Sequence, residues 1–142
     1  MKKKIIFVST LILFFFIYNL VLVSENESAN DVLENSLEAL VNYDIETYVE
    51  NAEIEWSESK SETIKELYSL QEDFPLVDYE ILEEEKISDD QYTFQVRTRY
   101  EKDGAMDIFE EPFQVIDMDG KWKVFISEEG LDLDEYELVE TK

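Results

Sequence analysis

The spacing of apolar residues changes once along this chain, near its middle. Between residues 28 and 74 the apolar positions recur every three to four residues, which is the period of a helix. The pattern predicts helices at 28–43, 43–52 and 61–74, with a short strand at 53–56 before the third helix. Ser28, followed three residues later by Asp31, resembles a capping box at the start of the first helix.

From Leu76 onward apolar and polar residues alternate, which is the period of strands with one buried face. Strands are predicted at 76–87, 91–100, 105–118 and 121–127, with turns at 89–90 and 102–104. A bulge or a sheet edge is expected near Pro112, because proline cannot donate to a strand ladder. In the second strand one face carries Tyr92, Phe94, Val96, Thr98 and Tyr100.

The last two strands meet at Asp119-Gly120, a preferred two-residue loop of the type I′ hairpin. That loop pairs Met118 with Lys121 and Val115 with Val124. One face of the hairpin then packs against the helices and carries Phe113, Val115, Trp122, Val124 and Ile126. The other face is half apolar and half cationic, and we expect the C-terminal tail or a second copy of the chain to cover it.

The N-terminus has the pattern of a membrane segment. Lys2, Lys3 and Lys4 precede an apolar run over residues 5–23, and 19 helical residues span roughly 28 Å, close to the hydrocarbon core of a bilayer. The positive-inside rule places the N-terminus in the cytoplasm and the rest of the chain outside. We favour an uncleaved signal-anchor, since no good small-x-small cleavage site follows; the alternative is secretion after signal cleavage. The expected organisation is a signal-anchor or signal peptide at 1–24, a short linker at 25–28, a domain at 29–127 and an acidic tail at 128–142.

Charge and composition exclude several classes of function. The chain has 36 acidic and 12 basic residues, a net charge of −24, and neither cysteine nor histidine. Such acidity excludes nucleic acid as a partner, because phosphates would be repelled. The lack of cysteine and histidine excludes disulfides, thiolate nucleophiles and Cys/His zinc sites, and we expect no metal and no cofactor. Hydrophobic residues at 44% and aromatic residues at 13% nevertheless favour a folded domain.

The order of elements resembles a known superfamily. Helix, helix, short strand, helix and then an antiparallel meander ending in "DGKWKVF" (119–125) is similar to NTF2-like proteins over residues 29–127. The resemblance implies an α+β cone in which three N-terminal helices pack on a curved antiparallel sheet of about four to five strands. Similar domains occur, membrane-anchored and extracytoplasmic, in Gram-positive bacteria. The superfamily includes enzymes, small-molecule binders and interaction modules, so the fold alone does not choose a function.

Two groups of residues are candidate sites. The aromatic residues predicted to face inward could line a ligand pocket, although such residues are more often core: Tyr43, Trp56, Tyr79, Tyr92, Phe94 and Trp122. The second group is a predicted cationic strip on the outer sheet face, made of Arg97, Arg99, Lys121 and Lys123, whose alternative is cross-strand pairing with glutamates.

The expected function is a non-catalytic binding or interaction domain held at a membrane by residues 5–23. Its partner would be another protein, or a second copy bound through the outer sheet face. One alternative is a small-molecule binder that uses the aromatic cavity. The other is an isomerase or dehydratase with an aspartate base and a tyrosine donor, although the nearest inward acid, Asp117, lies beside a turn where a solvated carboxylate is expected. A buried carboxylate within hydrogen-bond reach of a tyrosine would favour the enzyme.

Overall fold

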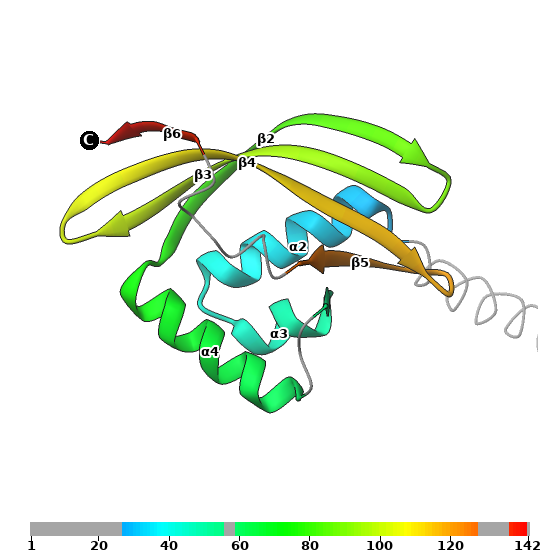
Figure 1. Ribbon diagram of the computed structural model, residues 1–142, viewed down its shortest axis with the longest axis horizontal. Helices are drawn as coiled ribbons and strands as arrows, with labels where there is room; N and C mark the ends of the chain where they lie inside the picture. The colour runs from blue at the N-terminus through cyan, green and yellow to red at the C-terminus, as the bar shows by residue number, and fades with distance from the viewer. Residues whose placement is uncertain (1–26, 56–58, 128–136, 142) are drawn as a thin grey trace, which may run out of the picture.

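The computed structural model describes residues 27–55, 59–127 and 137–141. Three helices, α2 (Ala29–Val41), α3 (Ile45–Glu50) and α4 (Lys60–Asp73), lie on one side of a curved sheet (Figure 1). In these ranges no helix combines the length and the apolar character needed to cross a membrane. The predicted anchor at 5–23 lies outside the described residues.

Side-chain hydrogen bonds cap the N-termini of α2 and α3. The Oγ of Ser28 accepts a hydrogen bond from the Asp31 backbone N–H at 3.2 Å, and an Asp31 carboxylate oxygen accepts one from the Ser28 N–H at 2.9 Å. This confirms the predicted capping box. Asp44 caps α3 in the same way through the N–H of Thr47. Each cap satisfies backbone donors that have no partner within the helix.

The sheet has a continuous path of five strands in the order β1-β5-β4-β3-β2, and a sixth strand, β6, pairs with β4. The bounds are β1 Ala52–Ile54, β2 Leu76–Ser88, β3 Gln91–Lys102, β4 Ala105–Met118, β5 Lys121–Ile126 and β6 Glu137–Thr141. The path of five strands agrees with the expected four to five, and β6 adds to it. One expectation needs correction: the sheet is not wholly antiparallel, because β1 runs parallel to β5.

The hairpin of β4 and β5 has the predicted register. Met118 lies opposite Lys121 and Val115 opposite Val124. Asp119 and Gly120 both have positive φ, 57° and 84°, as a type I′ loop requires.

Proline at position 112 marks an edge and not a bulge. The pairing of β3 with β4 runs without a shift, and Gln95 lies opposite Pro112. On its other side β4 pairs with β6 through Glu110 and with β5 from Gln114 onward. Pro112 therefore falls between two partner strands, where its missing N–H costs no ladder hydrogen bond.

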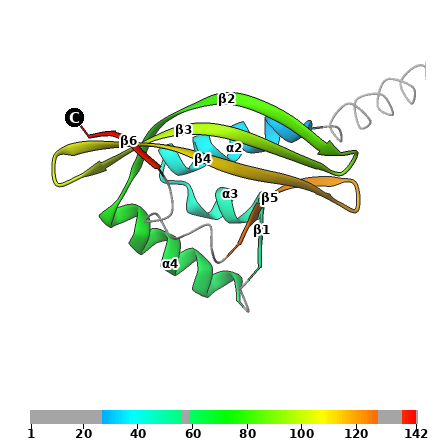
Figure 2. The ribbon, with the colours of Figure 1, turned by 45° about the horizontal axis from the view of Figure 1, so that its top comes forward.

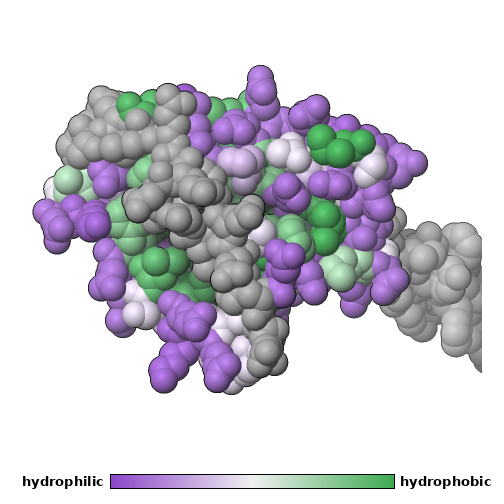
Figure 3. Space-filling view, in the orientation of Figure 1, coloured by the Kyte–Doolittle hydropathy of each residue, from purple (hydrophilic) through white to green (hydrophobic). Residues whose placement is uncertain are grey.

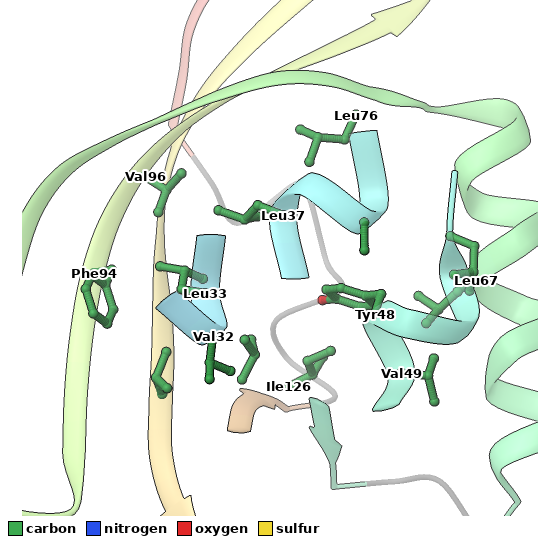
Figure 4. Packing of buried hydrophobic residues seen from close by; sticks show 14 of the residues in the cluster. Val32, Leu33, Leu37, Tyr48, Val49, Leu67, Leu76, Phe94, Val96 and Ile126 are labelled. Atoms are coloured by element: carbon green, nitrogen blue, oxygen red, sulfur yellow. The ribbon is translucent and has the colours of Figure 1, made fainter. Parts of the chain in front are cut away.

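The core lies between α2 and the concave face of the sheet, which arches over the helices in Figure 2. Figure 4 shows Leu33 and Leu37 of α2 pointing toward Phe94 and Val96 of β3, and all four side chains are fully buried. Val115 and Val124 of the hairpin are also fully buried. Burying each large apolar side chain contributes roughly 1.5–3 kcal/mol to folding. This burial is the main reason why the apolar face of the alternating strands points inward.

The described part of the tail joins the sheet at a different place from the one expected. The backbone of Leu138 lies opposite Phe109 of β4, and Glu137 lies opposite Glu110. The tail was expected to cover the outer-face residues Ile116, Met118 and Phe125. The covering residues would be Leu131, Leu133, Tyr136 and Leu138, and the first three of these four lie outside the described residues. The side chain of Met118 is 40% exposed. The strand β6 thus pairs with residues 107–110 of β4, and β5 pairs with residues 114–118 of the same strand.

Candidate functional site

Glu111 places a buried carboxylate on the inward face of the sheet. Glu111 is only 5% exposed, and it sits on β4 opposite Val96, between the inward-facing Phe109 and Phe113. It makes none of the ion pairs found within the described residues. Buried acids are normally paired with a cation, so an acid that is buried without an ion pair is a candidate functional residue.

Two hydroxyl groups of β3 hold this carboxylate. Thr98, itself fully buried, donates from Oγ1 to Glu111 Oε1 at 2.5 Å. Tyr100 donates from its hydroxyl to the same oxygen at 3.1 Å. Within the described part of the chain both hydrogen bonds to Glu111 end on Oε1, so Oε2 is the acceptor that remains for another group. We call Glu111, Thr98 and Tyr100 the polar centre.

The polar centre shifts the acidity of its members. Burial raises the pKa of Glu111 above its ordinary value, and the hydrogen bonds from Thr98 and Tyr100 partly oppose that rise. Burial also raises the pKa of Tyr100 well above 10, and the nearby charge of Glu111 adds to the effect. The same two causes raise the pKa of Tyr48 on α3. Both tyrosines therefore keep their protons at neutral pH.

Aromatic rings surround one side of the polar centre. The ring of Phe74, just after α4, stacks on Tyr100 with centroids 4.8 Å apart, and Phe109 meets both rings edge-on at 6.3 and 5.9 Å. The Nζ of Lys102 lies 5.5 Å from the centroid of Phe74, within cation–π range. We call Phe74, Tyr100 and Phe109 the ring cluster. Figure 3 shows apolar surface between polar side chains on the reader's side of the molecule, below the β3–β4 hairpin and above α4.

The aromatic residues named from the sequence do not form one group. Tyr92 contacts Phe94 and Trp122, with centroids 6.2 and 5.4 Å apart, and Phe94 is fully buried core. Tyr43, just after α2, is 40% exposed and packs on Tyr68 of α4 with ring centroids 5.6 Å apart. Tyr79 packs partly against the core, and its hydroxyl contacts the Glu34 carbonyl at 3.4 Å. Trp56 lies outside the described residues.

The predicted cationic strip is replaced by ion pairs. Arg97 lies between Glu110 and Glu80, at 2.6 and 3.1 Å, and Arg99 pairs with Asp78 at 2.5 Å. Lys123 donates to the Glu50 carbonyl, and Lys121 is exposed on β5. The arginines therefore pair across strands β2, β3 and β4, which was the alternative interpretation, and their charge is largely neutralised locally.

Neither Asp117 nor a group of metal-binding side chains within the described residues offers a competing site. Asp117 Oδ1 accepts a hydrogen bond from the Gly120 N–H at 2.7 Å, so this acid stabilises its own turn. In the ranges that the structure describes, no three acidic side chains are grouped so as to hold a metal ion.

Sequence reasoning missed Glu111 although a signal for it was present. Strand alternation places Glu111 on the same face as Phe113 and Val115, which were predicted to face inward. Extending that pattern back by two residues identifies the acid. A bulge at Pro112 would have turned Glu111 to the other face, and the unbroken register of β3 with β4 shows that no bulge is present.

Comparison with known proteins finds likeness in structure and not in sequence. No family model matches the chain, and no curated protein matches it. Solved structures do, among them a SEC-C motif containing protein from Rhodopseudomonas palustris, with a TM-score of 0.58 and 16% identity over 84% of this chain and 87% of that one.

Two further structures bear directly on the fold. A ketosteroid isomerase-like protein from Erwinia carotovora atroseptica has a TM-score of 0.55 and 18% identity, and the match covers 69% of this chain and 91% of that one. An NTF-2 like protein of unknown function from Shewanella oneidensis has a TM-score of 0.51 and 14% identity over 68% and 93% of the two chains. Identities this low show the fold alone. The chain has an α+β fold of the NTF2-like kind, with a polar centre on the inward face of its sheet.

Proposed function

We propose that this chain is a non-catalytic binding domain that recognises a small ligand at the polar centre and the ring cluster. The observation that carries the proposal is Glu111, a buried carboxylate held by two hydroxyls beside three aromatic rings. Ligand sites combine apolar walls with a few converging polar groups, and this arrangement has both. A purely structural role would not need a charged group, since burying it costs free energy that an apolar residue would not.

The sequence supports a location for this binding. Residues 5–23 are long and apolar enough to anchor the chain, and the three lysines before them place the domain on the outer side of a membrane. Deleting residues 1–24 should then release the protein from the membrane fraction of cells that express it. Retention of the shortened chain in that fraction would contradict the anchor.

The test of ligand binding uses three small probes that share one ring: benzylamine, benzyl alcohol and benzoate. The full-length chain, kept in solution with an uncharged detergent, is labelled on its phenylalanine and tyrosine rings and followed by NMR. At least one probe should shift the resonances of Tyr100 and Phe109, and Glu111→Gln should reduce that shift. If none of the probes moves these rings, the proposed binding site is wrong.

A second function is favoured by one specific observation. Glu111, with a raised pKa and a tyrosine hydroxyl on its oxygen, has the geometry of a general base beside a hydrogen-bond donor, with glutamate in place of the expected aspartate. The probe here is 5-nitrobenzisoxazole, whose ring opens when a desolvated carboxylate removes its proton. A rate that rises with pH and disappears in Glu111→Gln would favour the enzyme. A rate equal to that of buffer would leave binding as the function.

A further inference from the structure

The hydrogen-bond directions in the polar centre specify the polarity of its ligand. Both hydroxyl donors, Thr98 and Tyr100, are already committed to Glu111 Oε1. The group left over within the described residues is an acceptor, Oε2. A ligand that meets the ionised carboxylate must therefore bring a donor, and a carbonyl or carboxylate ligand would face an acceptor without a proton to share.

The ring cluster adds a preference for positive charge. The faces of aromatic rings attract cations within about 6 Å, and the side chain of Lys102 already places its Nζ 5.5 Å from the centroid of Phe74. The adjoining ring of Tyr100 stacks on Phe74 and also holds Glu111. A carboxylate and a cluster of aromatic rings thus lie side by side, and both attract an ammonium group more than a neutral one.

Long-range charge acts in the same direction. The chain carries a net charge of −24, and its field concentrates cations and repels anions at the surface. Glu111 has only hydroxyl partners within the described residues, so a cation would also supply the counter-charge that a buried carboxylate normally has.

From these three observations we propose that the ligand is a small organic ammonium ion, bound with its charged group on Glu111 Oε2 and its apolar part against the rings of Phe74, Tyr100 and Phe109. This inference rests on the proposed binding function and names its ligand class. It assigns Glu111 the charge recognition, and it assigns Lys102 the role of a resident cation that competes for the face of Phe74.

The three benzyl probes test this inference separately from the binding function. Benzylamine, which is protonated at neutral pH, should shift the Tyr100 and Phe109 rings at lower concentration than benzyl alcohol or benzoate. Glu111→Gln should weaken benzylamine at least about tenfold and should weaken benzyl alcohol much less. Glu101→Gln, an exposed neighbour on β3 with the same change in charge, is the matched control and should change benzylamine binding by less than about twofold.

Lysine variants give a second test that does not disturb the buried acid. Lys102→Gln should tighten benzylamine binding by about twofold to fivefold, because the competing cation is removed. Lys121→Gln, an exposed lysine on β5, makes the same charge change and should have a smaller effect. Because the comparison of these two variants uses one probe in one detergent, partition of the probe into micelles affects both variants equally.

The outcomes of these experiments distinguish the proposed ligand-binding function from the proposed ammonium ligand. Stronger binding of benzyl alcohol or benzoate than of benzylamine at these rings overturns the ammonium inference and leaves the binding function standing. If Glu101→Gln weakens the binding of benzylamine as much as Glu111→Gln does, the ammonium inference is also overturned and the binding function still stands. No ring shift with any probe overturns both. If Glu111→Gln fails to fold, the Lys102→Gln and Lys121→Gln pair decides, and equal effects of these two variants overturn the inference.

Discussion

Replacing Thr98 by valine removes one hydroxyl group and keeps the shape of a side chain that is fully buried. The hydroxyl donates to Glu111 Oε1 at 2.5 Å, so the loss depends on whether that carboxylate is charged. A hydrogen bond to a charged group contributes about 1.5–3 kcal/mol, and one between neutral groups contributes about 0.5–1.5 kcal/mol. The free energy of unfolding should therefore fall by the smaller amount at low pH and by the larger amount at high pH.

The direction of the pH effect follows from the pKa of Glu111, which burial raises above the ordinary 4.5. Between the ordinary and the raised value the folded chain holds more protons than the unfolded chain, so the stability contribution of Glu111 falls as pH rises through this window. The Thr98 hydroxyl opposes that fall because it favours the ionised carboxylate. Without it the folded-state pKa rises further, and the variant loses additional stability as pH increases.

The assay is urea unfolding of the full-length chain, followed by tryptophan fluorescence, from about pH 5 to about pH 9, above the sequence pI of about 4.1. Thr93→Val is the matched control, since Thr93 lies on the opposite face of β3 and is half-buried. It should change the free energy of unfolding by less than about 0.5 kcal/mol at every pH. A Thr98→Val effect that is the same across this range would refute the idea that Glu111 changes its charge in the folded protein.

Four other substitutions test the fold by the same unfolding measurement. Phe94→Ala should cost about 3–5 kcal/mol, because a fully buried ring is lost, whereas Met118→Ala on the outer face should cost less than about 1 kcal/mol; equal losses would contradict the assigned faces. Gly120→Ala should cost about 1 kcal/mol, since its φ of 84° strains any residue with a Cβ although no atom lies within 4 Å of that position; an unchanged midpoint would contradict the type I′ loop. Ser28→Ala should cost about 1 kcal/mol through loss of the cap of α2, and unchanged stability would show that the capping box does not form.

Much of the fold follows from interactions between residues close in sequence. Ser28 and Asp31 are three residues apart, and the hairpin register depends on two loop residues with positive φ. The period-two pattern chooses the buried face, because a slip by one residue would move Phe94 and Val124 into water. These features need no knowledge of distant segments, so the sequence predicts them.

The candidate site depends on segments that are far apart in sequence. Phe74 follows α4, Tyr100 lies near the end of β3, and Glu111 is in the middle of β4. Alternation alone places Glu111 inward, but only the packed structure shows that Thr98 and Tyr100 donate to it and that Phe74 stacks on Tyr100. The neutralisation of Arg97 by Glu80 and Glu110 likewise depends on the register of three strands.

The sequence by itself thus determined the helices, the alternation of the strands and the type of the last hairpin, since each depends on backbone preferences and on burial within a short segment. Only the tertiary structure decided that β1 pairs in parallel with β5, that β6 pairs with β4, and that Glu111 accepts hydrogen bonds from two hydroxyls. Those features depend on contacts between strand edges and side chains that are far apart in sequence. The free energy of such long-range contacts is not determined by any short stretch of residues.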